Sequence, residues 1–303
     1  MPYYSGSFND MAGLRSALVN ACTANGWTAS GNFLSKGAAV LQLVAGLTDL
    51  TLRGGTGRDG DALVEPAPGA GRIGTLGPQP VTFPGSYEVY VFTSPDEVYL
   101  RINYNVEFWQ WLAFGVSDVP GVPGTGLWFG GAMRQTSVSA VSIDAGGGGP
   151  ILSRQDLTSA ALFHGGDNSQ VPAASKSSFA HHGFDGLEWS GAAPSGQLTN
   201  NASIVAALAP KLARQPNAWN SADVLLNTQV YVRRLDDKQT LVADLAHCRF
   251  LRIDNYQPGD IIPLGPDRWK VAPWYRKNTA QRDGGSNIQH TGTFGWAIRY
   301  DGP

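Results

Sequence analysis

The stretch YEVYVFTSPDEVYLRINYNVEFWQWLAFG, residues 87–115, decides the fold of this chain. Apolar residues recur at every second position on both sides of the tetrapeptide SPDE, residues 94–97, and a period of two predicts β-strands. Pro95 is placed for a type I turn. The alternating apolar positions are Tyr87, Val89 and Val91 before the turn and Val98, Leu100, Ile102 and Tyr104 after it. The sequence therefore predicts an antiparallel hairpin that runs directly into the apolar segment behind it.

That segment, EFWQWLAFG, is apolar on both faces. Strict alternation would place Phe108, Leu112 and Phe114 on one face and Trp109 and Trp111 on the other. A strand with two apolar faces is buried on both sides. We expect its own core to cover one side, and either the C-terminal half or a neighbouring subunit to cover the other. The pattern favours packing over catalysis.

Residues 1–130 are interpreted as an α+β N-terminal domain. Residues 7–26 have apolar positions at spacings of three and four and predict a helix, with Ser7 or Asn9 as its N-cap. Short runs between residues 27 and 55 predict a meander of antiparallel strands, followed by a Gly/Pro-rich loop over residues 54–84. The expected arrangement is an N-terminal helix packed on antiparallel strands.

Residues 131–303 are interpreted as a loop-rich, mainly β region. Glycine-rich segments at residues 121–133 and 146–150 indicate a boundary or a projecting loop. Residues 151–220 indicate long loops with short strands and a helix-like piece at residues 201–214. The later strand-like segments are residues 226–235, 249–256, 268–277 and 293–303. The predicted fold class is therefore α+β and β-rich.

Charged residues make up only 15% of the chain, against about 25% in typical soluble domains. A net charge of −2 provides no basic face for nucleic-acid binding. A surface with few charges also offers little electrostatic protection against association. The composition thus favours a subunit of an assembly.

Cys22 and Cys248 are expected to be unpaired buried thiols. The N-terminus MPYYSGSFND has neither the basic nor the apolar region of a secretory signal, and no apolar run approaches the roughly 20 residues that span a bilayer. We therefore expect synthesis in a cytoplasm.

The segment GGTGRDG resembles a dinucleotide-binding motif through Gly55, Gly57 and Gly60. Such a site requires a helix after the last glycine, and Pro66 and Pro68 would break that helix. The same loop contains three carboxylates, at Asp59, Asp61 and Glu65. Their spacing does not match the alternating ligands of a Ca²⁺ loop. We interpret the segment as a structural loop.

The segment HHGFDGLEW is the most reactive-looking cluster. It contains His181, His182, Asp185 and Glu188, with His164 nearby in the sequence. Adjacent histidines on a strand point to opposite faces, and the spacing fits neither H-E-x-x-H nor a tetrahedral Cys/His site. We predict no metal site here. The sequence also contains neither a G-x-S-x-G nucleophile elbow nor a Walker A motif.

Carbohydrate chemistry stays open at the level of sequence. The two carboxylates of a glycoside hydrolase are about 5 to 9 Å apart in space, which no sequence spacing reveals. Exposed aromatic residues could also form a sugar-binding platform. The candidates for such a platform are Trp109, Trp111, Trp128 and Trp189.

Three stretches together resemble virion proteins of the tail and baseplate region of tailed bacteriophages. They are MPYYSGSFNDMAGLRSALVNACTANGW at the start, RIGTLGPQPVTFPGSYEVYVFTSPDEVYLRINYNVEFWQWLAFG, and PGDIIPLGPDRWKVAPWYRKN with HTGTFGWAIRYDGP at the end. They contain no catalytic motif, so the resemblance implies a structural role. It assigns no functional residues and leaves baseplate, tail tip, fibre attachment and collar open.

The function hypothesis is therefore a structural component of a bacteriophage virion, assembled in the host cytoplasm. Its expected partners are copies of itself and other virion proteins in a homo-oligomeric ring or cluster, with no nucleic acid, membrane or cofactor and no catalytic or metal-binding residues. The alternative is a virion-associated carbohydrate-binding protein or glycan hydrolase. The candidate interface residues are Phe108, Trp109, Trp111, Phe114, Trp128 and Phe129.

Overall fold

The computed structural model is built mainly of antiparallel strands. It describes residues 1–74, 80–134, 162–163, 177–186, 188–192, 224–235, 238–253, 255–277 and 294–302. Among these residues α1 (Met11–Thr23) is the one α-helix, and the strands fall into several sheets. The prediction of a β-rich protein is confirmed. The helix-like piece expected at residues 201–214 lies outside the described residues.

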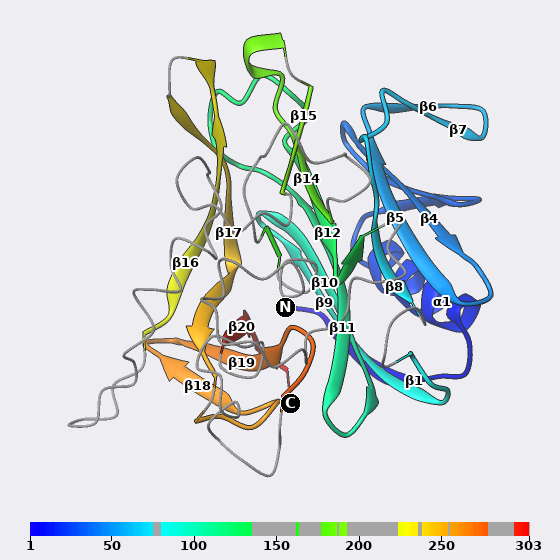
Figure 1. The fold of residues 1–303 in the computed structure, drawn as a ribbon, viewed down its shortest axis with the longest axis vertical. Coiled ribbons are helices and arrows are strands. Elements are labelled where there is room, and N and C mark those ends of the chain that lie inside the picture. Colours follow the sequence, from blue (N-terminus) through cyan, green and yellow to red (C-terminus); the bar gives the residue numbers. More distant parts are fainter. Residues whose placement is uncertain are drawn as a thin grey trace, which may run out of the picture.

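A seven-stranded antiparallel sheet, the central sheet, runs through the middle of the molecule (Figure 1). In spatial order it contains β1 (Tyr3–Phe8), β9 (Gly85–Thr93), β10 (Asp96–Asn105), β11 (Phe108–Val116), β12 (Leu127–Gly131), β14 (Ser178–His181) and β15 (Trp189–Ala192). The predicted hairpin is β9–β10, and β11 is the apolar segment that follows it.

Two local predictions within these elements are wrong in detail. The β9–β10 turn has only two residues, Ser94 and Pro95, joined by a cis peptide bond. Pro95 therefore holds the third position of a type VI turn and not the second position of a type I turn. At α1 the N-cap is Asp10, whose carboxylate accepts a hydrogen bond from Gly13 N at 2.6 Å, and neither Ser7 nor Asn9.

A second antiparallel sheet has six strands. In spatial order these are β13 (Met133–Arg134), β8 (Gly71–Gly74), β5 (Asp49–Gly55), β4 (Ala39–Ala45), β3 (Phe33–Lys36) and β2 (Thr28–Ser30). Strands β2 to β5 are the meander that the sequence predicts. The Gly-rich motif forms a separate hairpin of β6 (Gly57–Asp59) and β7 (Ala62–Val64), without the helix of a dinucleotide site.

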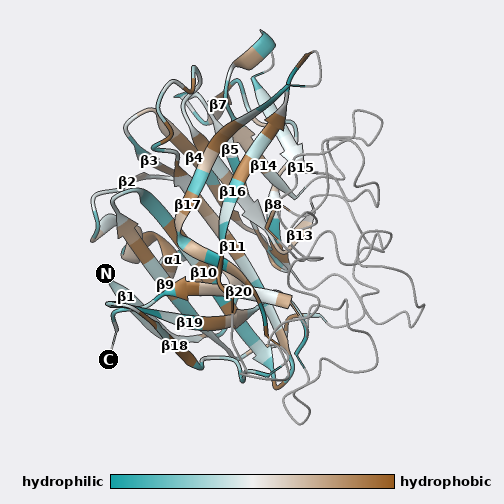
Figure 2. Ribbon diagram, turned by 90° about the vertical axis from the view of Figure 1, so that its left-hand side faces the viewer, coloured by the Kyte–Doolittle hydropathy of each residue, from teal (hydrophilic) through white to brown (hydrophobic). Residues whose placement is uncertain are grey.

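The C-terminal part of the chain forms a five-stranded antiparallel sheet. Its spatial order is β16 (Leu226–Arg233), β17 (Gln239–Arg252), β20 (Phe294–Arg299), β19 (Asp267–Pro273) and β18 (Ile261–Leu264). Each of the four strand-like segments predicted after residue 220 contributes to it. Figure 2 shows these strands in front of the central sheet, with β4 and β5 behind it.

The two apolar faces of β11 are thus covered by different parts of the same chain. On one face the rings of Trp111 and Trp296 in β20 lie 5.1 Å apart. On the other face Phe114 contacts Trp27, which follows α1, with a ring separation of 5.2 Å. The sequence left open whether the C-terminal half or a neighbouring subunit covers the second face of β11. In the structure the C-terminal half packs on the face that carries Trp111.

All six candidate interface residues are buried within the single chain, with between 0 and 7% of their surface exposed. They are Phe108, Trp109, Trp111, Phe114, Trp128 and Phe129. Their apolar surface is already used by intrachain packing, because both faces of the central sheet are covered. A contact with a neighbouring subunit therefore needs other residues.

Strand pairing crosses the expected domain boundary at residue 130. Strand β14 pairs with β12 in the central sheet, and β13 pairs with β8 in the six-stranded sheet. Cys22 and Cys248 are both buried and free. Among the described residues, no helix has the length and apolar character that crossing a bilayer requires.

Candidate functional site

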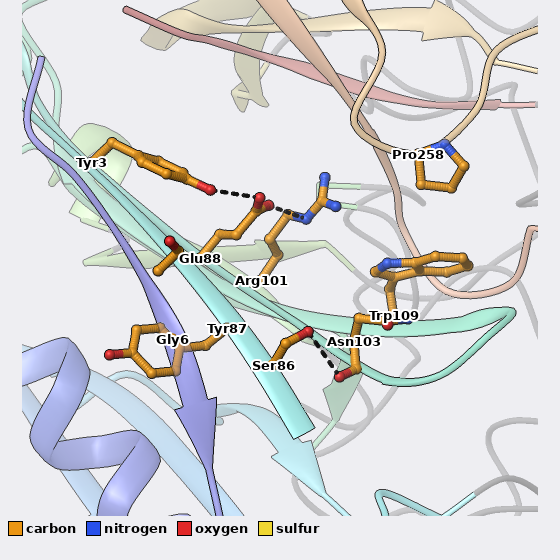
Figure 3. Close-up of a pocket in the computed structure, with 10 residues that line it drawn as sticks. Tyr3, Gly6, Ser86, Tyr87, Glu88, Arg101, Asn103, Trp109 and Pro258 are labelled. Carbon is orange, nitrogen blue, oxygen red and sulfur yellow. Dashed lines mark hydrogen bonds and ion pairs between the residues drawn. The ribbon is translucent and has the colours of Figure 1, made fainter. Parts of the chain in front are cut away.

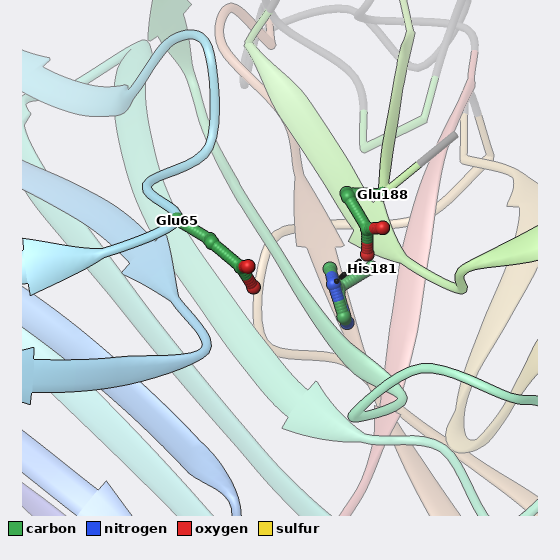
Figure 4. Close-up of side chains that lie close together, drawn as sticks. All are labelled: Glu65, His181 and Glu188. Carbon is green, nitrogen blue, oxygen red and sulfur yellow. Dashed lines mark hydrogen bonds and ion pairs between the residues drawn. The ribbon is translucent and has the colours of Figure 1, made fainter. Parts of the chain in front are cut away.

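A cluster of one histidine and two glutamates joins segments that are far apart in the sequence. His181 ends β14, Glu188 precedes β15, and Glu65 follows β7 on the opposite side (Figure 4). One ligand atom from each residue lies within 4.8 Å of the others. Trp189 connects the same segments, because its Nε1 donates to the carbonyl of Glu65 at 3.0 Å.

The hydrogen bonds of His181 determine which nitrogen carries its proton. The backbone N–H of Thr125 donates to Nδ1 at 2.8 Å, so Nδ1 must present its lone pair. The neutral ring therefore carries its proton on Nε2, which lies 3.1 Å from Glu188 Oε2 and donates to it. A metal bound at Nε2 would need the lone pair that this proton occupies. The geometry fits a hydrogen-bonded cluster better than a metal centre.

The other residues of HHGFDGLEW point elsewhere. His182 accepts a hydrogen bond from Phe184 N at Nδ1 and contacts Ser190 Oγ through Nε2 at 2.8 Å. Asp185, in the 3₁₀ turn η3 (Phe184–Gly186), pairs with Arg234 at 2.8 Å. Hydrogen bonding to Arg234 lowers the pKa of Asp185. Of the four residues singled out in the sequence, only His181 and Glu188 come together, and Glu65 joins them.

The tryptophan platform that the sequence left open as an alternative is not an exposed surface. Trp109, Trp111 and Trp128 are buried at 4, 0 and 1% exposure, and only Trp189 is partly exposed. Trp189 packs against Phe129 and His181. Sugar binding by stacking on a row of exposed indoles is therefore excluded for these residues.

A pocket of about 470 Å³ opens at one end of the central sheet (Figure 3). This volume lies within the usual range of small-ligand sites. Its lining comes from β1, β9, β10, β11 and the loop between β17 and β18. The lining residues are Tyr3, Ser5, Gly6, Ser86, Tyr87, Glu88, Arg101, Asn103, Trp109 and Pro258.

Strand register explains why polar residues gather in this pocket. Ser5 lies opposite Glu88, which lies opposite Arg101, and the next pairs are Ser86 with Asn103 and Asn103 with Trp109. These positions share the face of the central sheet that also carries Trp111. The five-stranded sheet packs on the part of this face around Trp111. The pocket lies next to that part, where the five-stranded sheet does not cover the central sheet completely.

The pocket floor contains a saturated carboxylate between two cations. Glu88 Oε2 lies 2.8 Å from Arg101 Nε, and Glu88 Oε1 lies 2.6 Å from Lys270 Nζ. Tyr3 and Tyr90 donate their hydroxyls to the same carboxylate at 2.7 and 3.0 Å. Burial opposes ionisation of Glu88, but Arg101 and Lys270 outweigh it and lower its pKa to about 2. The group therefore has one positive charge in excess.

A second buried carboxylate, Glu97, links the central sheet to the five-stranded sheet. It accepts backbone hydrogen bonds from Ala246 at 2.7 Å and His247 at 3.0 Å, and the hydroxyl of Tyr99 at 2.7 Å. Residues 246–248 have no partners in the β16 register, so Glu97 satisfies amides that this irregularity in β17 leaves free. Burial raises the pKa of Glu97 to about 7, because its effect exceeds that of these hydrogen bonds, which lower the pKa.

The sequence interpretation missed Glu88, Glu97, Arg101 and Lys270. Glu88 and Arg101 alternate with apolar residues, and such positions usually face solvent. Glu97 was interpreted as part of a turn. One signal was available in the sequence. In both β9 and β10 a tyrosine lies two residues from a charged residue and therefore on the same face: Tyr90 follows Glu88, and Tyr99 precedes Arg101.

Two comparisons, one with protein-family models and one with curated sequences, find no relative of this chain. No protein-family model matches it, and no curated protein sequence matches it.

Proposed function

We propose that this protein is a structural subunit of a tailed-bacteriophage virion, in the baseplate or in a tail attachment or collar complex. Its partners would be copies of itself and other virion proteins, and its assembly would take place in the host cytoplasm. The proposal is supported by the likeness of three sequence stretches to tail and baseplate proteins and by the low content of charged residues. No catalytic activity is required for this role.

The observation that carries the proposal is the presence of exposed apolar side chains at hairpin tips. Within the described residues four tips have one each: Leu47 is 96% exposed, Val106 and Leu235 are each 72% exposed, and Leu264 is 52% exposed. Turns usually carry Gly, Asn, Asp or Ser, which satisfy or relax the backbone there. A projecting apolar tip gains free energy when a neighbour covers it, at about 25 cal/mol per Å² of apolar surface.

The arrangement of the hairpins suits contacts with more than one neighbour. Figure 1 shows the turns of β10–β11 and β16–β17 at opposite ends of the molecule. In this proposal the N-terminal helix packed on antiparallel strands, together with the central sheet, forms the rigid body of the subunit. The hairpin tips make the contacts between subunits, in place of the buried aromatic residues.

Purified virus particles provide the test. Mass spectrometry should detect the chain at a fixed copy number, and particles assembled with Leu47→Asp should incorporate less of it. Thr48→Asp is the matched control, because Thr48 is also exposed and the variant adds the same charge one residue away. Absence of the chain from particles, or equal incorporation of both variants, would contradict the proposal.

A second candidate function is a virion-associated carbohydrate-binding protein or glycan hydrolase. The observation that favours binding is the polar pocket with its buried ionic floor. The observation that favours hydrolysis is that carboxylate oxygens of Glu65 and Glu188 lie within 4.8 Å of each other. Retaining glycosidases have carboxyl groups about 5 Å apart. Release of reducing sugar that is lost in both Glu65→Gln and Glu188→Gln would support the hydrolase; no release from any polysaccharide would exclude it.

A further inference from the structure

We propose that the pocket of about 470 Å³ between β1, β9, β10, β11 and Pro258 binds a sugar unit that carries a carboxylate group. The inference deepens the second candidate function by naming a ligand class for this pocket. It does not depend on any role in a virus particle, because the binding can be measured on the isolated chain.

The charge balance of the pocket floor indicates an anionic ligand. Arg101 and Lys270 both contact Glu88, so two positive charges face one negative charge. The carboxylate of Glu88 accepts hydrogen bonds from Lys270, Tyr3 and Tyr90 and forms an ion pair with Arg101. The single negative charge of Glu88 neutralises only one of the two cations. The excess of one positive charge matches a single carboxylate and would leave a phosphate dianion undercompensated.

Arg101 is the group that presents this charge to the pocket. Its Nε contacts Glu88, and its Nη1 donates to the carbonyl of Val271 at 3.2 Å. Within the described part of the chain, Nη2 donates to no protein group. The guanidinium is held in place by two strands and lines the cavity (Figure 3). An arginine fixed in this way is pre-organised to bind a carboxylate.

The remaining walls provide groups that fit the hydroxyl-bearing and apolar surfaces of a sugar ring. Ser5 and Ser86 are exposed hydroxyls on neighbouring strands. Asn103 uses its Nδ2 for the carbonyls of Asn105 and Phe108, and in the described residues its Oδ1 accepts no hydrogen bond. Trp109 and Pro258 form an apolar side of the same pocket. A few placed polar groups beside an apolar wall are typical of ligand sites.

Binding is tested with the full chain and defined small probes. Calorimetry and ligand-observed NMR at low salt compare glucuronic acid and N-acetylneuraminic acid with glucuronamide, glucose and inorganic phosphate. We expect the carboxylate sugars to bind at least about tenfold more tightly than the neutral sugars, because a charge-assisted hydrogen bond is lost in the neutral probes. Equal binding of acidic and neutral sugars, stronger binding of phosphate, or no binding of any sugar would overturn the proposal.

Two matched variants separate pocket binding from general charge effects. Ser86→Glu places a carboxylate at the exposed rim of the pocket, and Ser16→Glu adds the same charge on α1, outside it. Ser86→Glu should weaken binding of the acidic sugar at least about tenfold by like-charge repulsion, while Ser16→Glu should change it less than about twofold. Both serines are exposed, so a folding defect is not expected, and circular dichroism verifies this. Equal effects of the two variants would contradict the assigned site.

Discussion

The two faces of the central sheet are covered in different ways. On the face toward the six-stranded sheet the contact depends on glycine: a Cβ at Gly71 would lie 2.5 Å from Gly131 N, so the two backbones touch. The Gln110 amide is bonded at 2.8 and 3.0 Å to the backbone of Gly74. On the face toward the five-stranded sheet, aromatic rings are mixed with buried charges such as Glu97 and Arg101.

Because of this difference, the stability of one face should depend mainly on side-chain size and that of the other on pH. A contact between backbones tolerates no added atoms but contains no group that titrates near neutral pH. A contact through buried carboxylates changes its free energy whenever one of them gains or loses a proton. We therefore expect the two faces to respond differently to substitution and to pH.

The largest effect is expected for Trp111→Ala, on the aromatic face. Trp111 is fully buried against Trp296, and its removal leaves a large cavity between two sheets. Unfolding in denaturant should show a loss of about 3–5 kcal/mol. Val106→Ala, at an exposed tip, should change stability by less than about 0.5 kcal/mol. A loss below about 1 kcal/mol for Trp111→Ala would show that this face is not tightly packed.

The next effect is the pH dependence caused by Glu97. Its folded-state pKa of about 7 exceeds the ordinary value of 4.5, so the folded state binds more protons between these pH values. Its contribution to stability is complete below pH 4.5 and is lost as the pH rises through 7. From pH 5 to pH 8 the wild type should lose on the order of 3 kcal/mol relative to Glu97→Gln.

The comparison with Glu97→Gln is needed because His247 acts in the opposite direction. Burial lowers the pKa of His247 below 6.5, so its contribution decreases stability as the pH falls. Both proteins retain His247, and its effect cancels in the difference. Parallel stability curves for the two proteins between pH 5 and pH 8 would contradict the assignment to Glu97.

A smaller effect is expected for Gly71→Ala, on the glycine face. The added methyl group would meet the backbone of Gly130 and Gly131, which cannot move aside like a flexible side chain. The loss in unfolding free energy should be about 1–3 kcal/mol and should not depend on pH. Gly57→Ala is the control, since its Cβ would be 3.5 Å from Val64, an ordinary contact. Equal losses for both variants would mean that close approach of the sheets is not the cause.

The smallest effect is expected when metal ions are added. The Nε2–H of His181 donates a hydrogen bond to Glu188, and its Nδ1 accepts one from Thr125 N, so the cluster with Glu65 offers no free nitrogen lone pair. A saturating ligand would stabilise the folded state by several kcal/mol through mass action. Stoichiometric Zn²⁺ or Mn²⁺ should leave the melting temperature unchanged in wild type and in His181→Ala. A rise of several degrees that is absent in His181→Ala would establish a metal site.

The architecture could be predicted from the sequence where local periodicity is strong. The alternation of apolar residues around residues 94–97 predicted the hairpin. The two apolar faces of β11 predicted that this strand is buried between two layers. The pocket and the Glu97 contact could not be predicted, because they join residues about 150 to 180 positions apart, as in the Glu97–His247 and Glu88–Lys270 pairs. Glu65 and His181 are also far apart in the sequence, by 116 positions. Only the pairing of the sheets brings such groups together.

Hydrogen–deuterium exchange tests the contrast between the two faces most directly. Wild type and Glu97→Gln would be compared at pH 6 and pH 8, with rates corrected for intrinsic exchange. If exchange occurs through local opening, protection in β17 and β20 of the wild type should fall at pH 8 relative to Glu97→Gln, because ionised Glu97 weakens that interface. Protection in β4 and β5 should be the same in both proteins at both pH values. An equal change in the two sheets, or no change in β17, would contradict the account.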